Sequence, residues 1–221
     1  MNFKFNSKYF KTNGLIHYWP FSSSIYDLIG GAHLWNGTKA GLTLDRLGRP
    51  LSALNLNVGK YELPIRNYFP NINFSITFWF YLRSSSQYSR LIEFSNYLGS
   101  DAIMFVPYFG TNLPGFLLRN NNSKNILYLK DTNQIPLKTW IHVGLTFQYP
   151  TGSLYLNGSR VSSGTCTERP ANITRELNLI GRSSFYPNYK DLNGIVDELK
   201  IFNRALSTQE IHFEMNNDLF N

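Results

Sequence analysis

Cysteine is nearly absent from this chain of 221 residues, which contains Cys166 alone, so no disulfide can form within it. Cys166 lies in a segment rich in Ser, Thr and Gly with no histidine beside it to act as a base, and we therefore predict no catalytic thiol. Long apolar runs are also missing. No stretch is long enough to span a bilayer, and the amino terminus lacks the uninterrupted apolar region of a secretory signal.

Charge is sparse and unbalanced. Charged residues make up 16% of the chain, and 21 Lys and Arg against 14 Asp and Glu give a formal net charge of +7. An excess of positive charge suits an anionic partner such as a sulfated glycan, a nucleic acid or an acidic lipid surface. The basic residues are scattered rather than clustered, and no strand-like segment has the aromatic and glycine pattern of an RNA-reading sheet. We therefore do not expect a nucleic acid as the partner.

Aromatic residues are abundant, with 17 Phe and 14 Tyr, and they follow the period of a β-strand. In Phe74–Leu82 and Ile141–Phe147 every second side chain is apolar, which predicts strands with one face in a core. Asn157-Gly158 supplies the positive φ angles of a tight hairpin turn. Only residues 207–215 look helical, with Ser207 and Glu210 at capping-box spacing. The predicted strands are 14–19, 51–58, 61–63, 74–82, 91–94, 102–108, 115–119, 126–129, 141–147, 154–156, 177–180 and 194–202. This pattern favours an all-β fold of two packed antiparallel sheets, with Trp19, Trp79 and Trp140 in its core.

Four segments in this order resemble the laminin G-like and pentraxin-like branch of the concanavalin A-like lectin/glucanase superfamily. They are G-L-I-H-Y-W-P-F with the Asp27 loop, F-S-I-T-F-W-F, W-I-H-V-G-L-T-F through L-Y-L-N-G-S-R, and L-N-G-I-V-D-E-L-K-I-F-N-R-A-L-S. The resemblance implies a concanavalin A-like jelly-roll β-sandwich with one short C-terminal helix. It also implies one domain over residues 14–221, after an N-terminal extension over residues 1–13.

Glycan-cleaving members of this superfamily use a pair of carboxylates on one strand, held close together on the same face. The nearest pair here is Asp197 and Glu198, and adjacent residues of a regular strand point to opposite faces. We therefore predict no catalytic residues and no enzyme activity.

The resemblance also implies a structural calcium ion where the loop after the first strand meets the closing strand, which maps to Asp27 and Asp197. A hard cation takes six to eight oxygen ligands, so backbone carbonyls and water would have to complete the shell. The alternative is that Asp27 caps its own loop through backbone hydrogen bonds, while Asp197 pairs with Arg204 or with a backbone donor.

Glycan recognition in a β-sandwich depends on exposed aromatic rings that stack on sugar C–H groups. Five aromatic residues lie among Asn, Gly, Pro and Ser in predicted loops or at strand ends, and they are the candidate ligand-binding residues: Tyr97, Tyr108, Phe109, Tyr186 and Tyr189.

Sequons for N-glycosylation occur at Asn36, Asn73, Asn121, Asn157 and Asn172, of which Asn73 is the least suitable because it lies at a strand edge. We expect a non-catalytic recognition module for a glycan or an extracellular protein, located outside the cell or at its surface. The alternatives are a glycan-degrading enzyme of the same architecture and a structural spacer in an adhesive or matrix protein.

Overall fold

The computed structural model describes residues 13–110, 112–184 and 188–218, which form thirteen strands, one 3₁₀ helix and one α-helix. The strands are β1 (Leu15–Trp19), β2 (Trp35–Thr43), β3 (Ala53–Leu63), β4 (Phe74–Leu82), β5 (Ile92–Ser95), β6 (Ile103–Phe109), β7 (Leu113–Arg119), β8 (Asn125–Lys130), β9 (Trp140–Gln148), β10 (Thr151–Leu156), β11 (Ser159–Thr165), β12 (Leu177–Ile180) and β13 (Leu192–Phe202). The helices are η1 (Tyr97–Gly99) and α2 (Thr208–Asn216). The prediction of an all-β class with one short C-terminal helix is confirmed.

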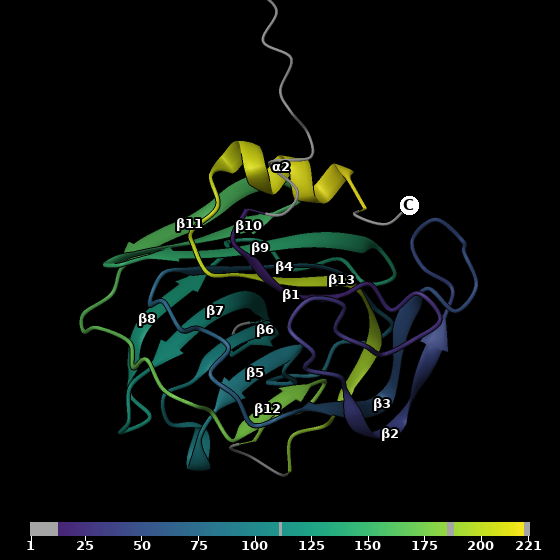
Figure 1. Ribbon diagram of the computed structural model, residues 1–221, viewed down its shortest axis with the longest axis horizontal. Helices are drawn as coiled ribbons and strands as arrows, with labels where there is room; N and C mark the ends of the chain where they lie inside the picture. The colour runs from purple at the N-terminus through teal and green to yellow at the C-terminus, as the bar shows by residue number, and fades with distance from the viewer. Residues whose placement is uncertain (1–12, 111, 185–187, 219–221) are drawn as a thin grey trace, which may run out of the picture.

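The strands are all paired antiparallel, in the order β11-β10-β9-β4-β13-β3-β12-β5-β6-β7-β8, with β1 added at β13 and β2 at β3. The sheet bends into two layers (Figure 1). In that view the upper layer contains β11, β10, β9, β4, β13 and β1, and the lower layer contains β2, β3, β12, β5, β6, β7 and β8. The two predicted antiparallel layers are therefore present. Hydrogen bonding continues from one to the other between the long strands β13 and β3.

The core lies between the two layers and is strongly aromatic. On β4 the alternate residues from Phe74 to Leu82 are at most 1% exposed, as predicted. Phe78 lies 5.6 Å from Phe105 of the lower layer, and Phe74 lies 6.4 Å from Phe116, measured between ring centroids. Trp19 is fully buried there as well.

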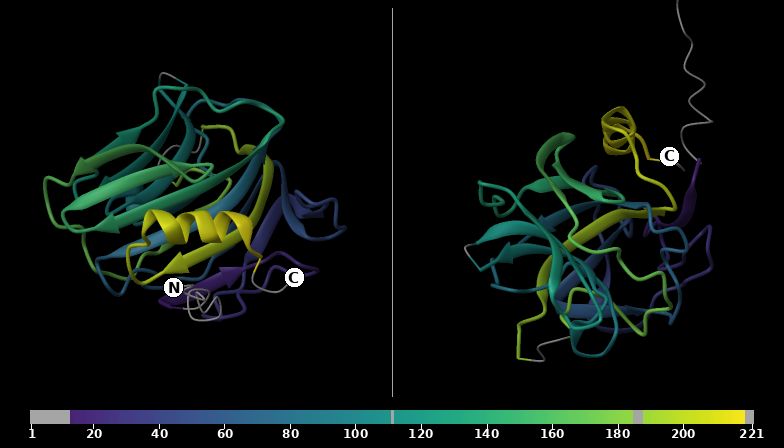
Figure 2. Two further views of the ribbon diagram at one scale, coloured as in Figure 1. Left: turned by 90° about the horizontal axis from the view of Figure 1, so that it is seen from above. Right: turned by 90° about the vertical axis from the view of Figure 1, so that its left-hand side faces the viewer.

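Helix α2 lies on the outside of the upper layer (Figure 2). It begins with the predicted capping box, in which the Ser207 hydroxyl accepts from Glu210 N and the Glu210 carboxylate accepts from Ser207 N. Gly144 of β9 lets the helix approach, because a Cβ there would lie 2.8 Å from Ile211 Cδ1. The outer face of β9 is therefore buried beneath α2.

The strands differ from the predicted ones in three places. Two predicted segments join into β3. Strand β2 and strand β11 were not predicted, because their polar, Gly- and Ser-rich sequences lack apolar alternation.

Residues 1–12, most of the predicted extension, lie outside the described residues. No helix in the described ranges has the length and apolar character needed to cross a membrane.

Candidate functional site

Four aromatic rings form a contiguous group on the outer face of the lower layer, which we call the aromatic row: Tyr189, Tyr88, Phe109 and Tyr128. Tyr189 stacks on Tyr88 with ring centroids 5.0 Å apart and an interplanar angle of 17°. Tyr88 meets Phe109 edge-on at 5.5 Å, and Phe109 lies 5.1 Å from Tyr128. All four rings remain partly accessible to solvent, and Tyr128 is 37% exposed. The row therefore offers aromatic surface drawn from segments far apart in the sequence.

A β-bulge decides which aromatic residue of β6 reaches this surface. The register between β6 and β7 shifts between Val106 and Phe109. In a regular strand Val106 and Tyr108 would share a face. With the bulge, Tyr108 enters the main core and Phe109 packs with the outer cluster that contains Val106.

Glycine and backbone contacts seat the other rings. A Cβ at Gly115 of β7 would lie 3.1 Å from Tyr128 Cε2, so glycine leaves room for that ring. Tyr88 N donates to Tyr108 O at 2.9 Å, which attaches the Tyr88 segment to β6. The Ser89 hydroxyl donates to Lys190 O at 2.6 Å and fixes the segment that carries Tyr189.

A buried ion pair supports the row from below. Arg90 and Glu93 are each at most 1% exposed, and Arg90 Nε lies 3.2 Å from Glu93 Oε2. Arg90 Nη1 also donates to Tyr88 O at 2.9 Å, so the pair orients the backbone of Tyr88. Burial lowers the pKa of the Arg90 guanidinium, and the charge of Glu93 opposes this effect. The pair therefore acts as a rigid support rather than as a ligand group.

The five predicted ligand residues have separate positions. Phe109 and Tyr189 belong to the aromatic row. Tyr108 is 5% exposed, and its hydroxyl donates to Ile135 O at 2.5 Å, so it is a core residue and not an accessible platform. Tyr97 is 75% exposed on η1 and makes no ring contact within the described ranges. Tyr186 lies outside the described residues.

Sequence reasoning missed Tyr88 and Tyr128. Tyr128 lies between Leu127 and Leu129, which are both buried, so it occupies the outer face of β8. That alternation was a usable signal. Tyr88 follows a Ser- and Gln-rich segment, and nothing local indicates that its ring would stack.

Asp27 caps its own loop, as in the alternative to the calcium site. One carboxylate oxygen accepts from Tyr18 N, Ile29 N and Gly30 N at 3.0 to 3.1 Å. The other accepts from Ala32 N at 2.9 Å and lies 2.6 Å from His17 Nδ1. Burial opposes ionisation, but the His17 contact and the backbone N–H groups hold the pKa of Asp27 well below its usual range. Its oxygens are thus already occupied by protein donors.

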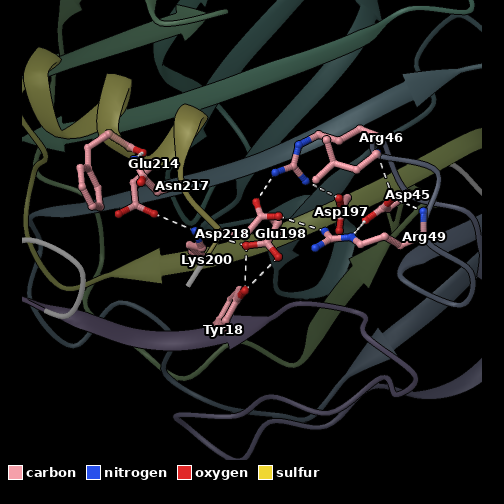
Figure 3. Close-up of polar contacts among 12 residues, drawn as sticks. Tyr18, Asp45, Arg46, Arg49, Asp197, Glu198, Lys200, Glu214, Asn217 and Asp218 are labelled. Carbon is pink, nitrogen blue, oxygen red and sulfur yellow. Dashed lines mark hydrogen bonds and ion pairs between the residues drawn. The ribbon is translucent and has the colours of Figure 1, made fainter. Parts of the chain in front are cut away.

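Asp197 belongs to a different group of contacts, the buried ion-pair network of Figure 3. Its Oδ2 lies 2.6 Å from Arg46 Nη1, and Arg46 also pairs with Asp218. Arg204, the partner considered from sequence, instead pairs with Glu210. The described residues contain no cluster of three or more His, Cys, Asp or Glu able to hold a metal. Asp27 and Asp197 are thus engaged by separate sets of protein groups, and calcium binding at these residues stays a prediction.

A second bulge, at Glu198, changes the predicted geometry of the acidic pair. Glu198 has φ +54°, and the register between β13 and β4 shifts between Asp197 and Lys200. The prediction that Asp197 and Glu198 point to opposite faces is therefore wrong, since both reach the network beneath α2 (Figure 3). Glu198 accepts from the Tyr18 hydroxyl at 2.7 Å and lies 3.3 Å from Lys200 Nζ. Burial, and next the charge of Glu198, raise the pKa of Asp197 to about 8.

Two tryptophans that were predicted in the core lie outside it, and one of them contacts the network. Trp79 is half-buried on the outer face of β4, where the Arg46 guanidinium lies 5.0 Å from its ring. Trp140 is half-buried as well and lies 5.7 Å from Tyr81. Both are on the outer face of the upper layer, so only Trp19 occupies the core as predicted.

The candidate glycosylation residues are surface residues. Asn36, Asn121, Asn157 and Asn172 are all exposed. The Asn36 amide donates to Glu62 and the Asn172 amide donates to Pro70 O, so a glycan there would replace an existing contact. Their modification stays a prediction.

A comparison with sequence models of known families shows to which superfamily the chain belongs. A laminin G-type sequence model, described as the concanavalin A-like lectin/glucanases superfamily, matches residues 57–212. The chain belongs to this superfamily. The resemblance seen in its four sequence segments is thereby confirmed. The search of curated proteins found no match to this sequence.

Solved structures share its fold at low sequence identity. Domain 4 of AbnA, a GH43 extracellular arabinanase from Geobacillus stearothermophilus, solved in complex with arabinotriose, superposes with a TM-score of 0.69 and 18% identity, covering 91% of this chain and 98% of that one. The binding domain of botulinum neurotoxin serotype C1 gives 0.70 and 14%, covering 92% and 52%. The binding domain of Paraclostridial Mosquitocidal Protein 1 gives 0.69 and 16%, covering 94% and 52%. The chain spans about half the length of these toxin domains, and at such identities the likeness shows the fold alone.

Proposed function

We propose that this chain is a non-catalytic, lectin-like module that binds a glycan through the aromatic row. The observation that carries the proposal is the row itself: four partly accessible rings, each in contact with the next, on the outer face of a sheet. Flat aromatic faces stack on the C–H surface of sugar rings, and such sites add a few polar groups for the hydroxyls. The exposed pair Gln87 and Asn112, joined at 3.2 Å, supplies amide groups from segments adjoining Tyr88 and Phe109.

The structural relatives support a glycan as the ligand class. The AbnA domain was solved with arabinotriose, and cell entry of botulinum neurotoxin type C is described as dependent upon interaction with two ganglioside molecules. AbnA is also described as extracellular. We extend the proposal to an extracellular or cell-surface setting, where the exposed sequons would be modified.

The surroundings of the acidic pair support a non-catalytic role. Asp197 and Glu198 are 0% and 4% exposed, and they are engaged by Arg46, Lys200 and Tyr18. A glycosidase carboxylate must reach the glycosidic oxygen or the anomeric carbon of a bound sugar. Buried and paired groups of this kind stabilise the contact between α2 and the sheet instead.

The test is calorimetric titration with neutral trisaccharides, arabinotriose among them. Tyr128→Ala should weaken binding by at least about 1 kcal/mol, roughly fivefold in Kd, because it removes an accessible ring. Gly115→Ala should also weaken binding, because the added Cβ would displace the Tyr128 ring. Tyr149→Ala is the matched control, since Tyr149 is a 45% exposed tyrosine outside the row. Equal losses in the control, or binding by no trisaccharide, would refute the proposal.

A further inference from the structure

A hollow lies on the same face of the lower layer as the aromatic row, over β3 and β12. It has a volume of about 330 Å³, and its lining includes Trp35, Ile65, Glu62, Glu176 and Arg182. Trp35 is 54% exposed and Ile65 is 66% exposed, while Leu179 of the floor is 8% exposed. The hollow thus combines an accessible indole with a buried apolar floor.

Trp35 is presented to solvent rather than packed. It begins the edge strand β2, opposite Glu62 of β3, and its ring makes no aromatic or cation–π contact within the described ranges. Glu62 is fixed beside it, because Asn36 Nδ2 donates to its Oε1 at 2.7 Å and Lys60 pairs with the same oxygen. An exposed tryptophan with a fixed polar neighbour is the usual composition of a sugar platform.

The charged groups around the hollow favour a neutral ligand that carries hydroxyl groups. Both cations are already paired, Lys60 with Glu62 and Arg182 with Asp191, the latter through two hydrogen bonds of 2.7 and 2.5 Å. The Glu176 carboxylate makes no hydrogen bond or ion pair with any described residue and remains an open acceptor. Open acceptors favour ligand hydroxyl groups, and an unpaired carboxylate repels an anion.

The strand register relates the hollow to the aromatic row. Trp35 pairs with Glu62, Glu62 with Leu179, Leu179 with Glu93, Glu93 with Met104, Met104 with Leu117, and Leu117 with Tyr128. Directly paired residues point to the same side of a sheet. Trp35 and Tyr128 therefore stand at opposite ends of one cross-strand line of six strand spacings, about 29 Å along the curved sheet.

We propose that the Trp35 hollow is a second sugar site, specific for a neutral, hydroxyl-rich ring. This inference rests on the proposed glycan-binding function and adds that the module is bivalent toward one glycan-bearing surface. Two sites on one face can engage such a surface together, so the affinity for a polymer exceeds that of either site alone.

The hollow can be tested apart from the row by iodide quenching of tryptophan fluorescence in the Tyr128→Ala variant, with the neutral trisaccharides as probes. Trp35 is the tryptophan open to iodide, since Trp19 is buried and the other two are half-buried. A trisaccharide should protect Trp35 from quenching, whereas its carboxylated or sulfated counterpart should not. Trp35→Phe should lose this signal but keep binding, because a flat ring remains.

Calorimetry and retention on a neutral polysaccharide complete the test. Trp35→Ala should reduce the stoichiometry from two trisaccharides per chain to one and lower retention at least about tenfold. Leu47→Ala, which removes a 64% exposed apolar side chain elsewhere, should change neither. Unchanged stoichiometry in Trp35→Ala, or no protection in Tyr128→Ala, would overturn the second site while leaving the row intact. Failure of every probe with the wild type would overturn both sites.

Discussion

At the residue scale, His142 is the group whose titration most directly couples pH to stability. It is 1% exposed beneath α2, its Nδ1 has no partner, and its ring lies 5.2 Å from Trp79. Burial, helped by the charges of Lys200 and Arg46, lowers the pKa of His142 to about 3. The folded state therefore binds fewer protons than the unfolded state below pH 6.5. The contribution of neutral His142 to the free energy of unfolding is therefore fully present above pH 6.5, and it is lost progressively as the pH falls toward 3.

The prediction is that the wild type loses about 2 kcal/mol of unfolding free energy through His142 between pH 7.5 and 5.0. His142→Phe keeps an aromatic ring but cannot titrate, so its loss over this range should be smaller by that amount. Urea unfolding of both proteins at the two pH values measures the difference. Parallel losses would mean that His142 can be protonated while buried.

Asp27 gives a second prediction at this scale. Asp27→Asn removes the charge that four backbone N–H groups and His17 share, and it should cost about 3 kcal/mol of unfolding free energy. If the backbone N–H groups and His17 are the only partners of Asp27, millimolar calcium should leave the melting temperature of both proteins unchanged. A calcium-dependent rise in the wild type that Asp27→Asn abolishes would instead assign the ion to this loop.

At two β-bulges, the face of the strand on which each side chain lies could not be predicted from the sequence. Period-two alternation correctly predicted the core face of β4. It did not distinguish Tyr108 from Phe109, which were both candidate ligand residues, and it placed Asp197 and Glu198 on opposite faces, because each pair lies at a register shift. A bulge depends on the partner strand as well as on its own residues, so alternation within one segment carries no sign of it.

At the element scale, Lys200 connects helix α2 to β13. Its Nζ lies 2.8 Å from Glu214 of the helix and 3.3 Å from Glu198 of its own strand, and all three groups are buried. Burial opposes the charged ammonium, but the two carboxylates raise the pKa of Lys200 overall. The helix is thus held by buried charge pairs in addition to the apolar contact of Ile211.

Removing the cation alone leaves two buried carboxylates unpaired. We predict that Lys200→Met destabilises the protein by about 3–5 kcal/mol, which urea unfolding would measure. The matched triple variant with Glu198→Gln and Glu214→Gln removes all three charges and should recover a large part of that loss. A triple variant less stable than Lys200→Met would show that the carboxylates stabilise the fold without the lysine.

The last of the four family-like segments predicted β13 but not the residues that β13 contacts. Arg46, which pairs with Asp197, is 151 positions away in the chain. Contacts of this separation follow from how the layers close, so they could not be predicted from any single segment.

At the scale of the whole molecule, the net charge of +7 and the proposed sites favour different ligands. The aromatic row contains only Tyr and Phe, and the cations at the Trp35 hollow are already paired with carboxylates. The excess positive charge therefore lies mainly outside the groups that would contact a sugar. Attraction of an anionic polymer by scattered surface cations is screened by salt, whereas stacking of a neutral sugar on aromatic rings is not.

We predict that binding of a neutral trisaccharide changes less than about twofold in Kd between 50 and 500 mM NaCl, because no net charge is transferred to the site. Binding of heparin, used as a sulfated comparison, should weaken steeply over the same range and should survive Tyr128→Ala. Surface plasmon resonance on both ligands makes the comparison in one experiment. If neutral binding fell with salt as steeply as heparin binding, surface charge rather than the aromatic row would be the basis of recognition.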